Sequence, residues 1–486
     1  YFQDKTCFQT KEIRKAYYGK ANYQQPLLVD FNMINSFPQE IMPRYDVVII
    51  GGGPAGSSLA SYLSLENVSV LLLEKEKFPR HHVGESLVPA SNRVFKEIGF
   101  MDIMEKAGFQ KKYGASWTAD GKRYYDHGWE GIDEDCLVGV EFSELEENDA
   151  YTFHVSRKKF DHLLLNHAAS KGAHVLQEAK VTKVNLVESG IHSVTFLVSG
   201  TSYNVNTPLI VDASGRDTFF GNRLQLKVKD PNFNQFAIHS WFKNYDRGFG
   251  KAADHIQIHF LPIPNSWIWQ IPITNSITSV GVVSQASSFN NQQLSHEEFF
   301  YQCAESYPEI AAKLEASDRV EPIRIEGDYS YAMTSITGNG WAMVGDAARF
   351  VDPIFSSGVS VALNSSRILA QNILKQKAEL KNDSFFTKEH LNEYAETLKN
   401  GTSIWYEFIT LYYKLNVLFT QFVNHPKHRK DILKLLSGDV YSSERPKVLD
   451  VMQKFIDEIE SNPKHFLHGK LGTLTADNLK STTLDQ

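Results

Sequence analysis

The distribution of apolar residues divides the chain into stretches with different repeat lengths. Residues 45–50 and 68–73 are short, nearly continuous apolar runs, which is typical of buried parallel strands. Helix-like apolar spacing at 57–65 lies between them, and similar short runs recur at 209–212 and 341–344. This alternation predicts a doubly wound, Rossmann-like α/β domain whose sheet draws on distant parts of the sequence.

The repeat length changes to two between about residues 235 and 285. Apolar and polar side chains alternate at 236–242, 255–260 and 267–272. This alternation predicts antiparallel strands with one packed face and one available face. A helix is expected at 297–316. The chain therefore predicts a smaller antiparallel sheet that interrupts the α/β domain.

After about residue 375 the pattern becomes helical. A dense aromatic stretch at 404–419 predicts a buried helix that covers the pocket, with core packing as its main role. The predicted organisation has four parts: an N-terminal extension (1–44), a discontinuous dinucleotide-binding domain (45–230 and 315–375), an antiparallel-sheet domain (231–314) and a helical C-terminal region (376–486).

Composition excludes several functional classes. The 486 residues carry a net charge of −7, which argues against a nucleic-acid partner. No apolar run is long enough to span a membrane. Cys7, Cys136 and Cys303 are too dispersed for a disulfide framework or a metal knuckle, which favours a reducing, cytoplasmic setting. His81 and His82 lack further spaced ligands, so no metal site is expected.

A glycine-rich turn follows the first strand directly. The sequence GGGPAG supplies Gly51, Gly53, Ala55 and Gly56, and the second strand ends about 20 residues later at Glu74. This is the G-x-G-x-x-G fingerprint in the strand–turn–helix context that gives it meaning. The glycines allow a tight turn close to a pyrophosphate, and Glu74 can accept hydrogen bonds from a ribose. The sequence therefore predicts dinucleotide binding here.

Further turns are expected to contact the same cofactor. Ser86 belongs to a Gly-Glu-Ser turn, for which helix capping is the simpler alternative. Arg157 begins an amphipathic helix with a basic start, and Asp212 ends a strand in the sequence Asp-Ala-Ser-Gly. Gly345 and Asp346 end another strand, where a backbone can approach a flat cofactor and a carboxylate can bind hydroxyl groups.

Two further segments carry candidate chemistry. The loop that holds Ser357 and Gly358 offers consecutive backbone N–H groups at a helix start, which suits an anion. The alternative is that its serines only cap the helix. Lys111 and Lys112 lie between glycines, and taken alone such a pair predicts a solvated loop.

Taken together, these motifs resemble the FAD-binding group of aromatic hydroxylases and flavin-dependent halogenases. Two features point to the halogenases. Trp267, Trp269 and Pro272 match the family's W-x-W-x-I-P motif, and GFQKKYGA at 108–115 resembles the lysine-bearing segment of phenol- and pyrrole-modifying members. In that segment Lys112 matches the catalytic lysine, which replaces the solvated-loop interpretation for Lys112 but not for its neighbour.

The resemblance implies an α/β fold: a Rossmann-like FAD-binding domain with an inserted antiparallel β-sheet substrate domain and a helical C-terminal region. It also implies that FADH2 and O2 oxidise chloride or bromide held by the Ser357 and Gly358 N–H groups. Hypohalous acid then moves to Lys112, which directs it to an electron-rich aromatic ring. A separate flavin reductase is expected, because no second G-x-G-x-x-G unit is seen for a nicotinamide nucleotide.

One departure from the family pattern narrows the substrate. Tryptophan-modifying halogenases carry a glutamate two residues before the serine that matches Ser357, whereas this chain has Phe355. A ring without that carboxylate must be activated by its own substituent, which favours a phenol or a pyrrole. The substrate is expected to be either free or tethered to a carrier protein.

Three other functions remain open from the sequence. An aromatic hydroxylase that uses FAD and NADPH would share the cofactor motifs, although Trp267 and Lys112 argue against it. A geranylgeranyl-reductase-like enzyme fits less well. A catalytically silent flavoprotein that serves as an interaction module is the third alternative, and the intact anion loop beside Lys112 argues against it.

Overall fold

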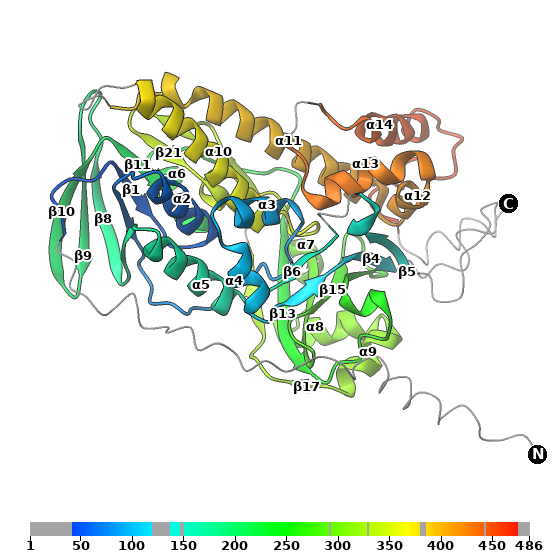
Figure 1. Cartoon of the computed structure of the whole chain (residues 1–486). Coiled ribbons are helices and arrows are strands. Elements are labelled where there is room, and N and C mark those ends of the chain that lie inside the picture. Colours follow the sequence, from blue (N-terminus) through cyan, green and yellow to red (C-terminus); the bar gives the residue numbers. More distant parts are fainter. Residues whose placement is uncertain are drawn as a thin grey trace, which may run out of the picture. The chain divides into compact units, whose positions relative to one another are not determined.

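The computed structural model describes residues 41–118, 137–145, 150–290, 293–327, 330–379, 385–441 and 444–474. All of these residues belong to one compact unit, Gln39–Gln486, which is called the second unit here because residues 1–38 precede it. The predicted N-terminal extension thus lies almost entirely outside the described residues, as does most of the polar tail after Leu474. Figure 1 shows the whole chain coloured by sequence.

A six-stranded sheet forms the cofactor half of the second unit. Its order is β20 (Thr337–Gly338), β21 (Trp341–Met343), β11 (Leu209–Asp212), β1 (Val47–Ile50), β2 (Val70–Leu73) and β7 (His174–Leu176). All neighbours pair in parallel except β20 with β21. Every residue of β1, β2 and β11 is buried, as their continuous apolar runs predict.

Helices cover this sheet as an α/β fold requires. Helix α2 (Pro54–Leu65) packs between α5 (Arg157–Ser170) and α10 (Ser357–Glu379). The predicted helix at 57–65 and the amphipathic helix from Arg157 are confirmed. A three-stranded antiparallel sheet, in the order β10 (Thr201–Thr207), β9 (His192–Val198) and β8 (Ala179–Asn185), lies at the left of Figure 1.

The inserted sheet is larger than its predicted segment. Its order is β17 (Asp318–Arg319), β13 (Gln235–Lys243), β16 (Ile277–Gln285), β15 (Trp267–Pro272), β14 (Ile256–Phe260), β4 (Gly114–Thr118) and β5 (Leu137–Glu141), with β18 (Arg324–Glu326) also paired to β13. The predicted limits of 231–314 therefore omit four strands. The alternation at 236–272 identified the central strands, but β4 joins β14 by a parallel, long-range pairing that alternation does not encode.

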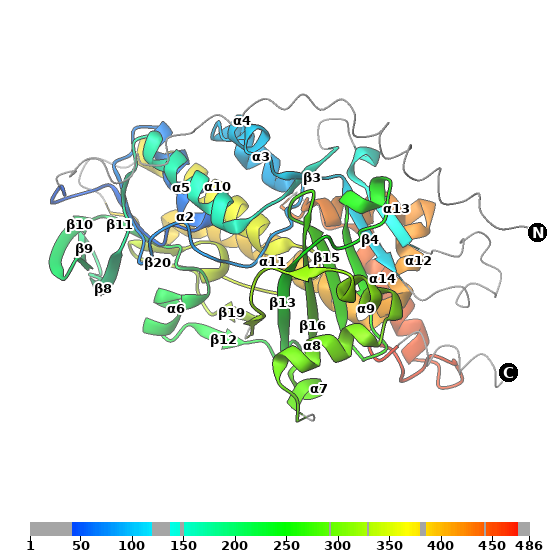
Figure 2. The ribbon, with the colours of Figure 1, turned by 90° about the horizontal axis from the view of Figure 1, so that it is seen from below.

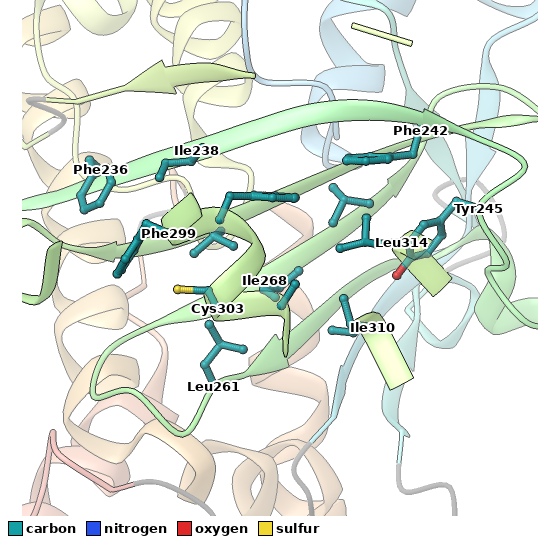
Figure 3. Close-up of a cluster of buried hydrophobic side chains, with 14 residues drawn as sticks. Phe236, Ile238, Phe242, Tyr245, Leu261, Ile268, Phe299, Cys303, Ile310 and Leu314 are labelled. Atoms are coloured by element: carbon teal, nitrogen blue, oxygen red, sulfur yellow. The ribbon is translucent and has the colours of Figure 1, made fainter. Parts of the chain in front are cut away.

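One face of this sheet packs against two short helices. Figure 3 shows the apolar cluster that lies between the sheet and these helices. Phe236, Ile238 and Phe242 alternate along β13, as the two-residue repeat predicts, and each side chain of this kind contributes about 1.5–3 kcal/mol when fully buried. The single helix expected at 297–316 is instead α8 (His296–Glu305) and α9 (Pro308–Glu315). Pro308 starts the second helix because its ring cannot continue the first.

The C-terminal region is helical, as predicted. It contains α11 (Asn392–Leu415), α12 (Phe419–Asn424), α13 (Pro426–Ser437) and α14 (Lys447–Glu460), coloured yellow to red in Figures 1 and 2. The aromatic stretch is buried, but α11 ends at Leu415 because Asn416 has a left-handed φ of 50°. Among the described residues, no helix is both long and apolar enough to cross a membrane.

The remaining elements complete the chain. They are α3 (Ala90–Glu97), α4 (Met101–Lys106), β3 (Gln110–Lys112), β6 (Thr152–His154), α6 (Phe219–Arg223), β12 (Lys227–Lys229), α7 (Ala286–Asn290) and β19 (Tyr331–Met333). Strands β3 and β6 form an antiparallel pair, and β12 pairs with β19. The β3–β6 pair carries the candidate lysine, Lys112.

Candidate active site

A cavity of about 680 Å³ lies where the carboxyl ends of β1, β2 and β11 meet the inserted sheet. Ligands of open α/β sheets bind at this edge. Most of the predicted site residues line it: Gly51, Gly53, Ala55, Glu74, Ser86, Arg157, Trp267, Trp269, Asp346 and Gly358. The predicted residues outside this lining are Gly56, Lys112, Asp212, Pro272, Gly345 and Ser357.

The glycines of the first turn have different roles. Gly51 has a φ of +109°, and a side chain there would overlap the Ala213 carbonyl. A side chain at Gly56 would overlap the Gly51 carbonyl, so both positions shape the turn. A Cβ at Gly53 would meet only the Arg80 guanidinium, 3.5 Å away. Gly53 therefore leaves open space at the start of α2, where an anionic pyrophosphate is favoured.

Glu74 faces this space from the end of β2. Its Oε2 accepts a hydrogen bond from the Gly52 N–H (2.6 Å), and its Oε1 accepts one from the Glu76 N–H (2.8 Å). Burial raises the pKa of this carboxyl, although the two backbone donors oppose the rise. The carboxylate is thus fixed in position, with lone pairs left for ribose hydroxyls.

Arg157 supports the Gly-Glu-Ser turn. Its Nε and Nη2 bind Asp161 at 2.7 and 3.0 Å, while its Nη1 donates to the Val83 carbonyl. This arrangement places a fixed cation at the cavity wall. Ser86 Oγ is buried without a partner among the described residues. An orphaned hydroxyl in the wall fits a polar ligand such as a dinucleotide.

The residues at the ends of β11 and β21 have different roles. Asp212 accepts hydrogen bonds from the Ser214 N–H (3.0 Å) and the Phe220 N–H (2.7 Å), so its carboxylate shapes its own turn while Ala213 and Ser214 line the cavity. Its expected direct contact with the cofactor remains a prediction. Gly345 donates its N–H to Ser365 Oγ (2.9 Å). Asp346 lines the cavity, where burial raises its pKa to about 6.

The two motif tryptophans donate hydrogen bonds to different elements, β16 and α11. Trp269 Nε1 donates to Ser279 Oγ (3.2 Å), and the Glu85 carboxyl belongs to the same region, since Ser279 is among the groups that lower its pKa. Trp241 Nε1 donates to the same carboxyl (2.6 Å). Burial raises the pKa of Glu85 to about 7. Trp267 instead reaches the C-terminal helices, and Pro272 ends β15 outside the cavity lining.

The expected anion loop has an unusual backbone. Ser356 has a φ of +56°, a left-handed conformation that non-glycine residues seldom adopt. Ser357 begins the 23-residue helix α10 and is buried, and its Oγ donates to the Asp352 carbonyl (3.3 Å). Ser356 and Gly358 line the cavity. A halide bound by the backbone N–H groups of Ser357 and Gly358 would therefore lie beside the space for the cofactor.

Lys112 is enclosed on the far side of the Gly-Glu-Ser turn. It ends β3, opposite Thr152 of β6, and its Nζ donates to the Leu87 carbonyl (2.8 Å). Burial alone lowers its pKa to about 7. Leu87 follows Ser86 directly, so one short extended segment separates the lysine amine from the cavity wall. The expected solvated loop is therefore a strand.

Lys111 points the other way. Its Nζ lies 3.2 Å from Glu105 and 3.8 Å from the centre of the Tyr151 ring, and its side chain is 37% exposed. Burial lowers its pKa, but hydrogen bonds with Tyr151 and Glu105 raise it more, for a net increase. The two lysines therefore differ in their surroundings, since Lys112 is buried and Lys111 is partly exposed.

Comparison with known proteins identifies the family of the chain. The FAD binding domain family matches residues 44–382. A 1H-pyrrole-2-carbonyl-[peptidyl-carrier protein] chlorinase from Pseudomonas fluorescens is 48% identical over 445 residues, covering 90% of this chain and 98% of that protein. The chain belongs to the flavin-dependent halogenases.

More distant relatives of the halogenase agree. A 1H-pyrrole-2-carbonyl-[peptidyl-carrier protein] brominase from Pseudoalteromonas luteoviolacea is 27% identical, covering 86% of this chain and 97% of that protein. The solved structure of the flavin-dependent brominase Bmp2 has a TM-score of 0.75 at 25% identity, covering 86% of this chain and 99% of that one. The predicted fold class, family, FAD dependence and use of halide and O2 are confirmed.

Four further residues make contacts near the site that motif analysis left unassigned. Glu85 stands inside the Gly-Glu-Ser turn and Asp352 inside the anion loop, but neither was singled out. Tyr413 belongs to the aromatic stretch for which core packing was the main expectation. His239 lies 5.6 Å from the Trp269 ring, and burial lowers its pKa to about 3. Their roles depend on contacts between distant strands and helices, which leave no local signal in the sequence.

Proposed function

We propose that this halogenase chlorinates or brominates the pyrrole ring of a pyrrole-2-carbonyl group carried on a peptidyl carrier protein. The observation that carries this proposal is the enclosed Lys112 amine, which the Leu87 carbonyl holds one residue beyond the cavity wall. The names of the Pseudomonas and Pseudoalteromonas relatives support the pyrrole and its carrier.

The cofactor end of the site is built to hold and orient FAD. Gly53 and the start of α2 would take the pyrophosphate, Glu74 the ribose hydroxyls, and Arg157 with Asp346 the remaining polar edges. Reduced FAD, when bound, would supply two of the four electrons that reduce O2, and the halide would supply the other two as it becomes hypohalous acid. Backbone N–H groups of Ser357 and Gly358 would hold the halide against this space.

Lys112 then receives the oxidised halogen. A neutral amine can react with hypohalous acid to give an N-halo amine and water, whereas the ammonium form can donate a hydrogen bond that polarises the acid. A pKa near 7 makes both forms accessible at neutral pH. The intervening segment keeps the ring away from the flavin, where direct oxygen transfer would hydroxylate it.

The surroundings of the anion loop favour an activated ring. Phe355 stacks on Phe408 with ring centres 4.4 Å apart and meets Tyr412 edge-on at 5.0 Å. This apolar environment replaces the carboxylate of the tryptophan-modifying enzymes. A pyrrole needs no such carboxylate, because its own nitrogen donates electrons to the ring.

Two further predictions accompany this function. A separate reductase would supply FADH2, which agrees with the lack of a second G-x-G-x-x-G unit in the sequence. A cytoplasmic location remains the expectation from cysteine usage.

The test compares substrates directly. The protein, FAD, an external flavin reductase and bromide would be mixed with a pyrrole-2-carbonyl carrier protein, with free pyrrole-2-carboxylate, or with a simple phenol. Intact-mass spectrometry should show bromine added to the carrier-bound pyrrole alone. Bromination of the free acid at an equal rate would remove the carrier from the proposal, and an added oxygen atom would restore the hydroxylase alternative.

A further inference from the structure

Tyr413 brings the C-terminal helices into contact with the active site. It lies on α11, beyond the region that the FAD binding domain family matches, and its side chain is buried. Its hydroxyl accepts a hydrogen bond from Trp267 Nε1 (3.1 Å). The same hydroxyl lies 3.0 Å from Gln235 Oε1 and 3.1 Å from Asp352 Oδ1, and it can donate to either.

Asp352 secures both ends of the anion loop. Its Oδ1 accepts the Ile354 N–H (2.9 Å), and its carbonyl accepts the Ser357 hydroxyl (3.3 Å). The residue is completely buried, and its Oδ2 has no partner among the described residues. Between these anchors, Ser356 holds its left-handed backbone, a conformation that persists only where surrounding contacts enforce it.

We propose that Tyr413 is a positioning residue for the halide, because through Asp352 it fixes the loop whose Ser357 and Gly358 N–H groups face the ion. This inference rests on the proposed halide site in that loop. It also gives Trp267 a specific role, since its indole N–H holds the Tyr413 hydroxyl toward the loop. One end of the W-x-W-x-I-P motif thereby sets the shape of the halide site.

The charge of Asp352 should make the affinity of the loop for a halide depend on pH. Burial raises its pKa to about 7. The side chains that face it are the uncharged hydroxyls of Tyr412 and Tyr413 from α11, and the Tyr413 hydroxyl in turn contacts Gln235 of β13 and Trp267 of β15. Arg349, three residues earlier, lies instead over the Tyr406 ring. Protonated Asp352 leaves the loop neutral, whereas ionised Asp352 repels an anion.

Bromide binding to the oxidised, FAD-loaded protein tests the inference without turnover. The shift in flavin absorbance on bromide titration gives the dissociation constant. Tyr413→Phe should raise this constant by roughly five- to tenfold, the effect of one ordinary hydrogen bond, while FAD affinity stays unchanged. Tyr412→Phe is the matched control, because its hydroxyl has no partner among the described residues and its removal should change nothing.

Two further variants keep the test decisive. Trp267→Phe removes the indole N–H that holds the Tyr413 hydroxyl. It therefore tests the same chain of hydrogen bonds, from Trp267 through Tyr413 to Asp352, if Tyr413→Phe does not fold. The two substitutions together should cost no more than either alone. Wild-type affinity should fall as pH rises through about 7, and Asp352→Asn should abolish that dependence.

Three results would overturn the inference. Wild-type bromide affinity in Tyr413→Phe would refute the positioning role alone. The same pH dependence in Asp352→Asn would refute the part played by its charge. A wild-type protein that binds no bromide and halogenates nothing would refute the proposed function together with the inference.

Discussion

The two ends of this active site are built from different materials. The cofactor end consists mainly of backbone, a glycine turn and the start of helix α2, together with the Glu74 carboxylate, which two backbone N–H groups hold in place. The lysine end consists of side chains enclosed between β3, β6 and the Gly-Glu-Ser segment. Backbone sites suit a large anionic cofactor that must bind tightly, whereas an enclosed amine suits a reactive group whose pKa must be lowered.

The largest expected effect comes from filling the cofactor end. Gly53→Val places a side chain in the open space at the start of α2, and its Cβ meets no backbone atom within 4 Å. The variant should fold with a normal Tm but lose FAD and all turnover. Flavin absorbance after gel filtration measures this, and retention of FAD would show that the cofactor lies elsewhere.

Changing the lysine end should separate the two halves of the reaction. Lys112→Met keeps the shape of the side chain but removes the amine that the Leu87 carbonyl holds. Halogenated product should fall by at least about a thousandfold, the scale seen when a reactive group is removed. Flavin oxidation should continue at the wild-type rate, because the cofactor end is untouched. Loss of both activities would show that Lys112 has been misassigned.

The buried amine should also leave a mark on stability. The pKa of Lys112 is about 7 in the folded protein and about 10.4 in an unfolded chain, so the unfolded state binds more protons between these values. Stability relative to Lys112→Met should therefore rise with pH from about 7 to 10, by up to about 1.4 kcal/mol per unit. Denaturant unfolding at several pH values measures this, and parallel curves for the two proteins would contradict it.

Glu74→Gln tests the cofactor end with a smaller expected loss of FAD affinity than Gly53→Val. The amide can still accept the Gly52 N–H but loses the charge that strengthens hydrogen bonds from ribose hydroxyls. The FAD dissociation constant should rise by about tenfold, as fluorescence titration of the flavin would show. An unchanged constant would place the ribose away from Glu74.

The smallest effect on halogenation is expected at Lys111, the residue next to Lys112. Lys111→Met removes a partly exposed ion pair with Glu105, which is worth at most about 1 kcal/mol. Halogenation should stay within about twofold of the wild-type rate. A loss comparable to that in Lys112→Met would reverse the assignment of the two lysines.

The same comparison explains what could be predicted from the sequence. The cofactor end was readable because its strand, glycine turn and helix are contiguous, and Gly51 and Gly56 occupy positions where a side chain would overlap backbone. Lys112 could be found only by resemblance. Its burial depends on β6, which begins far along the chain at Thr152, and local polarity predicted a solvated loop instead. The contacts of Glu85 and Tyr413 are likewise long-range.

The central claim is that oxidant forms at the cofactor end and is used at Lys112. The most direct test is a single turnover of pre-reduced wild-type and Lys112→Met protein with O2, bromide and carrier-bound pyrrole, in which trapped hypobromous acid and brominated pyrrole are measured together. We expect the wild type to brominate the pyrrole and the variant to yield only hypobromous acid. Brominated pyrrole from the variant at the wild-type level would contradict the account.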